Sequence, residues 1–279
     1  MENHANKTYQ ERMNKTASSK FGAIEKYLNK GIKLLDFGSG FSPGFIEQVQ
    51  QTGARYTAYD VSQIVQNQLK ENKVDFLTKE QLTNTEDGFD VIYMSSVFHE
   101  LMSYLSRQER RETFAMIDKA LKPDGVIVIR DWGYEPNPNE IASFEVASSK
   151  VNEEVHTWIN ELVKNSVIKR PRIAEHINED EADIYVTTKQ NIYEIMLHTV
   201  WGLNSLEREA RETYSVTPEL IDKWICHPYG YEDAKFTLTA REYDETYLPY
   251  LQKYFKIDSI PWPTKIIYEL RKKSTWRNS

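Results

Sequence analysis

The sequence predicts a doubly wound α/β fold, in which helices cover both faces of a mostly parallel sheet. Short apolar segments alternate with helix-like segments from residue 33 to residue 129, the pattern of repeated strand-helix-strand units. Two of these segments, FDVIYM (89–94) and VIVI (126–129), are almost wholly apolar. Such runs are typical of strands that are buried on both faces of a parallel sheet.

The first half of the chain supplies most of these elements in order. A polar, helix-compatible segment from Thr8 to Asn29 carries an apolar face and is expected to lie over the domain. After it, composition and turn residues predict alternating strands and helices. The expected strands are 33–37, 55–59, 74–77 and 89–94, and the expected helices are 45–51 and 62–72.

The next helix carries its own start and stop signals. Ser106 is followed three residues later by Glu109, which is the capping-box pattern. The segment Lys122-Pro123-Asp124-Gly125 ends the helix and turns the chain into the fifth strand, 126–129.

From residue 133 the pattern changes to helical stretches and polar loops. Val151, Val155, Trp158, Ile159 and Leu162 form one apolar helix face. Strand character returns at 235–243 and 265–270, around an expected helix at 250–255. We therefore expect a core in residues 1–132, a helical insertion that binds substrate in residues 133–234, between the fifth and sixth strands, and closing core strands in residues 235–279.

Composition limits the class of protein. The 279 residues carry a net charge of −7, which argues against broad binding to nucleic acid. No apolar run is long enough to cross a membrane, and no cleavable signal is visible, so a cytoplasmic protein without membrane contact is expected. Cys226 is the only cysteine, and the histidines lack ligand spacing, so neither a disulfide nor a metal site is expected.

The stretch LLDFGSGFSPG (34–44) places a glycine turn directly after the first strand. A dinucleotide fingerprint would need glycine at position 43, where this chain has Pro43. A phosphate-binding P-loop would need a lysine, and none occurs between Lys33 and Lys70. Pyrophosphate is therefore a poor candidate for the ligand of this turn.

Two acids beside the turn indicate a different ligand. Asp36 ends the first strand, where a carboxylate suits a cation and repels a phosphate. Asp60 ends the second strand, where a carboxylate accepts hydrogen bonds from both hydroxyls of a ribose. A ligand with a ribose, a positive charge and no phosphate is indicated, and S-adenosylmethionine meets that description.

At this point the sequence resembles the class I S-adenosylmethionine-dependent methyltransferases. The resemblance rests on four motifs in the family's order: LLDFGSG (34–40), AYDVS (58–62), FDVIYMSSVFHEL (89–101) and LKPDG (121–125). It implies a Rossmann-like sheet of seven mostly parallel strands and S-adenosylmethionine as cofactor. It also implies that Asp36, Gly38 and Gly40 contact the methionine part, Asp60 the ribose and Val61 the adenine, with Ser39 and Ser95 also among the cofactor-binding residues.

The catalytic group is less constrained, because methyl transfer mainly needs alignment and exclusion of water. His99 follows the fourth strand at the edge where ligands of such sheets bind, and it is the candidate for a general base or a substrate contact. The alternative is a structural histidine that forms hydrogen bonds with the backbone of a loop. The H-E-x-x-H zinc pattern fails, because Ser103 replaces the second histidine.

Trp132 and Tyr134, just after the fifth strand, are the candidates for stacking on a flat substrate, with anchoring of the insertion as the alternative for Trp132. Small-molecule methylation is the leading hypothesis. RNA or nucleotide methylation through the basic residues Lys164 to Arg172 is one alternative, and a cofactor-binding scaffold without catalysis is another. The sequence does not indicate the acceptor or the oligomeric state.

Overall fold

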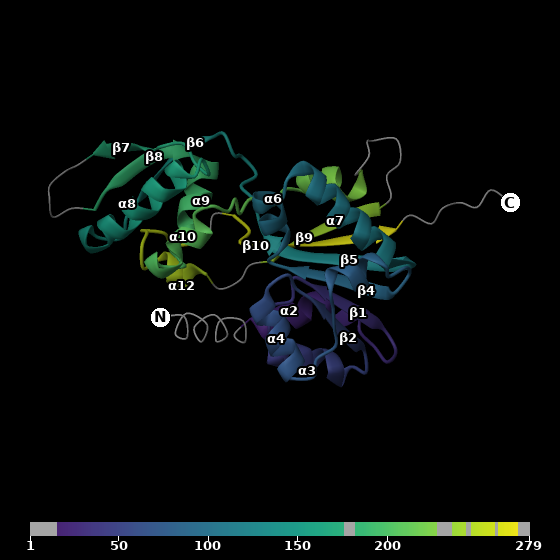
Figure 1. The fold of residues 1–279 in the computed structure, drawn as a ribbon. Helices are drawn as coiled ribbons and strands as arrows, with labels where there is room; N and C mark the ends of the chain where they lie inside the picture. Colours follow the sequence, from purple (N-terminus) through teal and green to yellow (C-terminus); the bar gives the residue numbers. More distant parts are fainter. Residues whose placement is uncertain (1–15, 176–181, 228–235, 244–246, 260–261, 273–279) are drawn as a thin grey trace.

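The larger of the two units of the fold is built around a seven-stranded sheet (Figure 1). The computed structural model describes residues 16–175, 182–227, 236–243, 247–259 and 262–272. The strand order is β3-β2-β1-β4-β5-β10-β9, and only β10 runs antiparallel to its neighbours. The strands are β1 (Lys33–Phe37), β2 (Arg55–Tyr59), β3 (Phe76–Leu77), β4 (Phe89–Ser95), β5 (Leu121–Trp132), β9 (Phe236–Tyr243) and β10 (Lys265–Lys272). The predicted seven-stranded, mostly parallel sheet is confirmed.

Helices cover both faces of this sheet, because successive side chains of a buried strand point to opposite faces. Leu34 packs with one apolar cluster and its neighbour Leu35 with the other. The first face carries α2 (Ala17–Ile24), α3 (Pro43–Gln51) and α4 (Gln63–Glu71); the second carries α5 (Lys79–Thr83), α6 (Phe98–Tyr104), α7 (Arg107–Ala120) and η3 (Asp222–Cys226). Residues 8–15 of the predicted first helix lie outside the described residues.

The predicted capping box at the start of α7 is present. The Ser106 side chain accepts a hydrogen bond from the Glu109 N–H, and the Glu109 carboxylate accepts one from the Ser106 N–H. These reciprocal bonds satisfy two backbone donors that have no partner within the helix.

The segment after β5 builds a second unit beside the sheet (Figure 1). It contains α8 (Ser149–Lys164), α9 (Lys189–Thr199) and α10 (Leu206–Glu209), but also an antiparallel sheet in the order β6-β8-β7. Its strands are β6 (Ile141–Glu145), β7 (Arg172–Glu175) and β8 (Ile184–Thr188). Beside the expected helices, the insertion therefore contains a small sheet that the sequence pattern did not indicate. These strands are four or five residues long, and β6 pairs with β8 about 40 residues further along the chain, so local patterning gave little sign of them.

The boundaries of the second unit also differ from the expected ones. Buried side chains of the segment 216–226 already pack in the core of the large sheet, although the sequence pattern predicted that the chain returns to this sheet near residue 235. Conversely, α12 (Leu248–Leu251) and Trp262 pack in the core of the second unit. The crossing segments meet at Gly133, whose N–H donates to Thr264 O and whose carbonyl accepts from the Val216 N–H.

Candidate functional site

The turn after β1 depends on two glycines. Gly38 and Gly40 have φ angles of 70° and 56°, in the left-handed region that strains other residues. A Cβ on Gly38 would also lie 2.5 Å from Cγ2 of Val97. The N–H groups of Gly38 and Ser39 donate to Tyr59 O at 2.7 and 3.1 Å, which ties the turn to β2. Both the backbone conformation and the available space therefore require glycine at position 38.

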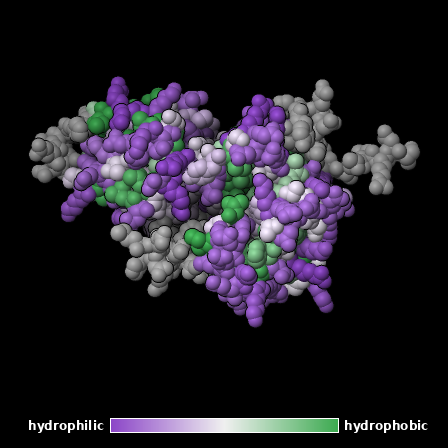
Figure 2. All heavy atoms as spheres, in the orientation of Figure 1, coloured by the Kyte–Doolittle hydropathy of each residue, from purple (hydrophilic) through white to green (hydrophobic). Residues whose placement is uncertain are grey.

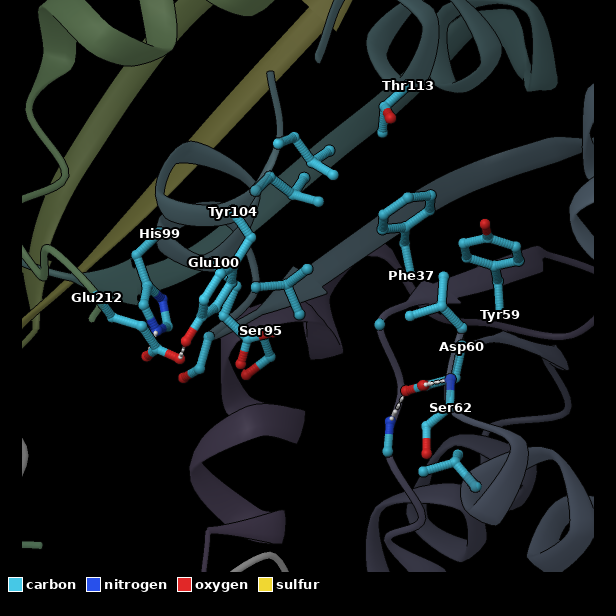
Figure 3. A pocket seen from close by; sticks show the side chains of 18 of the residues that line it. Phe37, Tyr59, Asp60, Ser62, Ser95, His99, Glu100, Tyr104, Thr113 and Glu212 are labelled. Carbon is cyan, nitrogen blue, oxygen red and sulfur yellow. Dashed lines mark hydrogen bonds and ion pairs between the residues drawn. The ribbon is translucent and has the colours of Figure 1, made fainter. Parts of the chain in front are cut away.

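Asp60 holds this turn from the end of β2 (Figure 3). Its Oδ2 accepts a hydrogen bond from the Gly40 N–H at 2.9 Å, and its Oδ1 accepts one from the Ser62 N–H at 2.8 Å. Each carboxylate oxygen has a second lone pair, so hydroxyl donors from a ligand can still be accepted. Asp60 thus combines a structural role in the turn with a surface that faces the cleft.

The residues that the sequence assigned to the cofactor separate into two groups. Gly38, Gly40, Asp60, Val61 and Ser95 line the cleft, and the Val61 side chain is 82% exposed there. The other two are buried and are not among the lining residues: Asp36 and Ser39.

Asp36 supports the turn from below. Its Oδ2 accepts a hydrogen bond from the Tyr56 hydroxyl at 2.7 Å. Burial raises the pKa of Asp36 to about 6, although Lys20 and the Tyr56 hydroxyl offset part of this effect. Burial also lowers the pKa of Lys20 to about 8, against the attraction of Asp36. Lys20, which the sequence did not single out, is the member of this group that reaches the cleft.

The cleft extends from the glycine turn to the second unit and has a volume of about 1930 Å³. Single-ligand pockets usually measure about 300 to 1,000 Å³, so this cleft has room for two molecules. In Figure 2, polar side chains dominate the visible face, and apolar ones gather along the junction of the two parts. The far end is lined by side chains of both units: His99, Glu100, Tyr104, Trp132, Trp201, Glu212 and Tyr247.

His99 is buried at this far end, between two carboxylates. Its Nδ1 lies 2.7 Å from Oδ1 of Asp131, and its Nε2 lies 3.2 Å from Oε2 of Glu212. The backbone N–H of His99 donates to the other oxygen of Asp131 at 3.1 Å. Burial alone would lower the pKa of His99, but the two carboxylates raise it to about 10. Both ring nitrogens are thus held by carboxylates.

Two groups beside His99 complete this end of the cleft (Figure 3). Tyr104 donates from its hydroxyl to Oε1 of Glu212 at 2.9 Å. Glu100 is exposed to the cleft, where desolvation and the charges of Glu212 and Asp131 raise its pKa to about 7, while His99 lowers it in part. Three carboxyl groups therefore gather around one imidazole.

Trp132 forms the wall next to this cluster. It is 2% exposed and stacks on Tyr214 with ring centroids 4.5 Å apart and planes 14° apart. The Lys265 ammonium lies 3.5 Å from the centroid of the Trp132 ring. Trp132 therefore both lines the cleft and packs in the core of the second unit. Tyr134 packs against the core of the large sheet instead and is not among the lining residues.

A comparison with protein families matches residues 9–179 to a family described as a methyltransferase domain. The match spans more than half of the chain, and it covers the glycine turn, Asp60 and β5. The chain belongs to the class I S-adenosylmethionine-dependent methyltransferases. Among curated protein sequences, no significant match is found.

Several solved structures of methyltransferases are similar to this methyltransferase at a distance. An S-adenosylmethionine-dependent methyltransferase from Mesorhizobium loti shares 16% identity over 91% of this chain and 97% of its own, with a TM-score of 0.49. A 1,6-didemethyltoxoflavin-N1-methyltransferase from Burkholderia thailandensis shares 13% identity over 98% and 83%, with a TM-score of 0.42. At these identities and TM-scores, the likeness supports no inference about the acceptor.

Two acidic residues of this methyltransferase site were missed by sequence reasoning. Glu209 and Glu212 lie in a segment rich in acids and arginines, a pattern typical of solvated surfaces, but they are 5% and 3% exposed, whereas the Glu207 side chain is 93% exposed. The one available signal was their spacing of three residues, which places them on the same side of a helical turn.

Among the described helices, none combines the length and apolar character that a membrane span needs.

Proposed function

We propose that this methyltransferase transfers the methyl group of S-adenosylmethionine to a small molecule that binds at the far end of the cleft. The observation that carries the proposal is a single cleft that joins the glycine turn to a pocket walled by both units. Its volume suits a cofactor and an acceptor together.

The residues near the turn suit the cofactor. Gly38 and Gly40 allow close approach of the backbone, and Asp60 offers acceptors to ribose hydroxyls. We assign Val61 to the adenine and Ser95 to the methionine end. We assign supporting roles to Asp36, which is buried beneath the turn, and to Ser39, which is buried within it.

The transfer itself requires little covalent chemistry from the protein. A lone pair of the acceptor attacks the methyl carbon, the bond from that carbon to sulfur breaks, and its electron pair stays on sulfur to give S-adenosylhomocysteine. Where the acceptor carries a proton, that proton leaves to solvent or to a base in the cleft. The chain contributes alignment and exclusion of water, for which Trp132, Trp201 and Tyr247 supply apolar walls.

The basic run that suggested RNA does not face the cleft. Lys164 pairs with Glu161 at 2.9 Å, and Arg170 donates to Asn160 at 3.0 Å. None of the residues from Lys164 to Arg172 is among those that line the cleft. This arrangement favours a solvated face over an RNA site and supports the choice of a small acceptor.

Incubation with methyl-labelled S-adenosylmethionine and a cell extract tests the proposal. The label is then divided by size and by sensitivity to nuclease and protease. We expect label in the small-molecule filtrate, and less of it with the Asp60→Ala variant. Label confined to nuclease-sensitive material would instead support RNA methylation, and saturable cofactor binding without label transfer to any fraction would support a scaffold.

A further inference from the structure

We propose that His99, Glu100 and Glu212 form a binding site for a divalent transition-metal ion in the wall of the cleft. Each residue offers one donor atom, and the three atoms lie within 4.8 Å of one another. The site is independent of the glycine turn, and its test does not require the acceptor to be known.

The donor atoms lie nearly as close together as the ligands of a coordination shell. Metal-to-ligand distances of about 2.1 Å place neighbouring ligands about 3 Å apart in an octahedron and opposite ligands about 4.2 Å apart. Nε2 of His99 and Oε2 of Glu212 lie 3.2 Å apart, close to the neighbouring distance. An ion bound between them would replace the direct contact of these two atoms and release the proton that the imidazole holds, because a ligating histidine is neutral.

The groups behind these donors are arranged as in metal sites. A ligating histidine usually gives its second ring nitrogen to a carboxylate, which fixes the ring and directs the other nitrogen to the ion. Here Asp131 holds Nδ1 of His99 at 2.7 Å and also accepts its backbone N–H, so that Nε2 is directed to Glu212. The Tyr104 hydroxyl holds the oxygen of Glu212 that does not face His99.

Glu100 gives the cluster a carboxylate whose oxygen atoms are available to bind a cation. Within the described part of the chain, its side chain has neither a hydrogen bond nor an ion pair, although it lies beside a buried pair of charges. It is the exposed member of the set, and all three members line the cleft, so an ion can enter from solvent. A cation would offset the mutual repulsion of Glu100 and Glu212.

The donor set indicates the class of ion. Magnesium and calcium prefer shells made of oxygen alone, whereas an imidazole with carboxylates suits manganese, iron or zinc. Three protein ligands leave positions that face the cleft, open to water or to oxygen atoms of the acceptor. The sequence gave no warning, because Glu212 is far along the chain from the adjacent pair His99 and Glu100.

Titration of the protein with Mn²⁺ alone, followed by calorimetry, tests the site. We expect binding of one ion per chain in the wild type and affinity at least tenfold weaker in Glu100→Gln, which removes a ligand charge at an exposed position. The matched control is Glu112→Gln, an exposed acid that lines the cleft outside the cluster. Equal affinity in wild type and Glu100→Gln, or no binding at millimolar Mn²⁺, would overturn the proposal.

Spectroscopy distinguishes Mn²⁺ bound at this site from Mn²⁺ bound nonspecifically at the protein surface. Pulsed electron paramagnetic resonance of the Mn²⁺ complex should show coupling to an imidazole nitrogen, and His99→Gln should remove it. A circular dichroism spectrum and melting temperature of each variant check that it is folded. Bound Mn²⁺ without nitrogen coupling would place the ion elsewhere and contradict the assignment. None of these readouts depends on methyl transfer, so the metal site and the proposed function can fail separately.

Discussion

The carboxylate of Asp60, at the end of β2, accepts a hydrogen bond from the backbone N–H of Gly40 in the turn after β1 at 2.9 Å. The two residues are 20 positions apart, yet the parallel pairing of β1 and β2 brings the ends of these strands together. The same carboxylate therefore shapes the turn and offers acceptors to a ligand beside it.

Replacement of Asp60 by alanine should weaken binding of S-adenosylmethionine about 10- to 100-fold. Hydrogen bonds to a charged acceptor contribute about 1.5 to 3 kcal/mol, and this range corresponds to that loss of affinity. Calorimetric titration measures it directly. Asp60→Asn, which keeps one acceptor oxygen, should lose less. An unchanged dissociation constant in Asp60→Ala would remove this residue from the cofactor site.

Replacement of Gly38 by alanine should lower both the melting temperature and the affinity for the cofactor. The new Cβ would strain a φ of 70° and lie 2.5 Å from Val97. Gly44→Ala is the matched control, because its Cβ would meet only Ala17 at 3.5 Å, an ordinary contact. That change lies inside α3 and should leave stability equal or slightly higher. Equal melting temperatures for both variants would contradict the steric explanation.

The burial of Asp36 should make stability depend on pH. Its pKa of about 6 in the folded protein exceeds the ordinary value of 3.8, so the folded state holds this proton more tightly. The stabilisation is full below pH 4 and is lost as the pH rises through 6. Urea unfolding from pH 4 to pH 7 should show wild type losing up to about 3 kcal/mol relative to Asp36→Asn. A constant difference would mean that Asp36 is already ionised at pH 4.

Tyr214→Phe should destabilise the protein by about 1.5 to 3 kcal/mol. The ring stacks between Trp132 and His198, and Phe preserves these contacts. The hydroxyl, however, donates to the buried carboxylate of Glu209, and that bond to a charged group is lost. Tyr250→Phe, at a side chain that is 56% exposed, should change the free energy of unfolding by less than about 0.5 kcal/mol. Similar small effects in both variants would show that the hydroxyl of Tyr214 contributes little.

Local sequence patterns predicted much of the large sheet and the end of the cleft that contains the glycine turn. Strands β1 and β2 were predicted with the bounds that the structure shows, because their apolar runs end at a glycine turn and at Asp60. The small sheet of the second unit was missed, since β6 pairs with β8 more than 40 residues along the chain. The burial of Glu212 was missed for the same reason, because its partners His99 and Tyr104 are supplied by α6, more than 100 residues earlier in the chain.

Hydrogen-deuterium exchange with and without S-adenosylmethionine tests most directly whether the cofactor binds at the glycine turn. Saturating cofactor should slow amide exchange in residues 38–41, 60–62 and 95–97, because these segments line or support the same end of the cleft. The segment 164–172 should exchange at an unchanged rate. Protection confined to other parts of the chain, with residues 38–41 unaffected at saturation, would contradict the placement of the cofactor site.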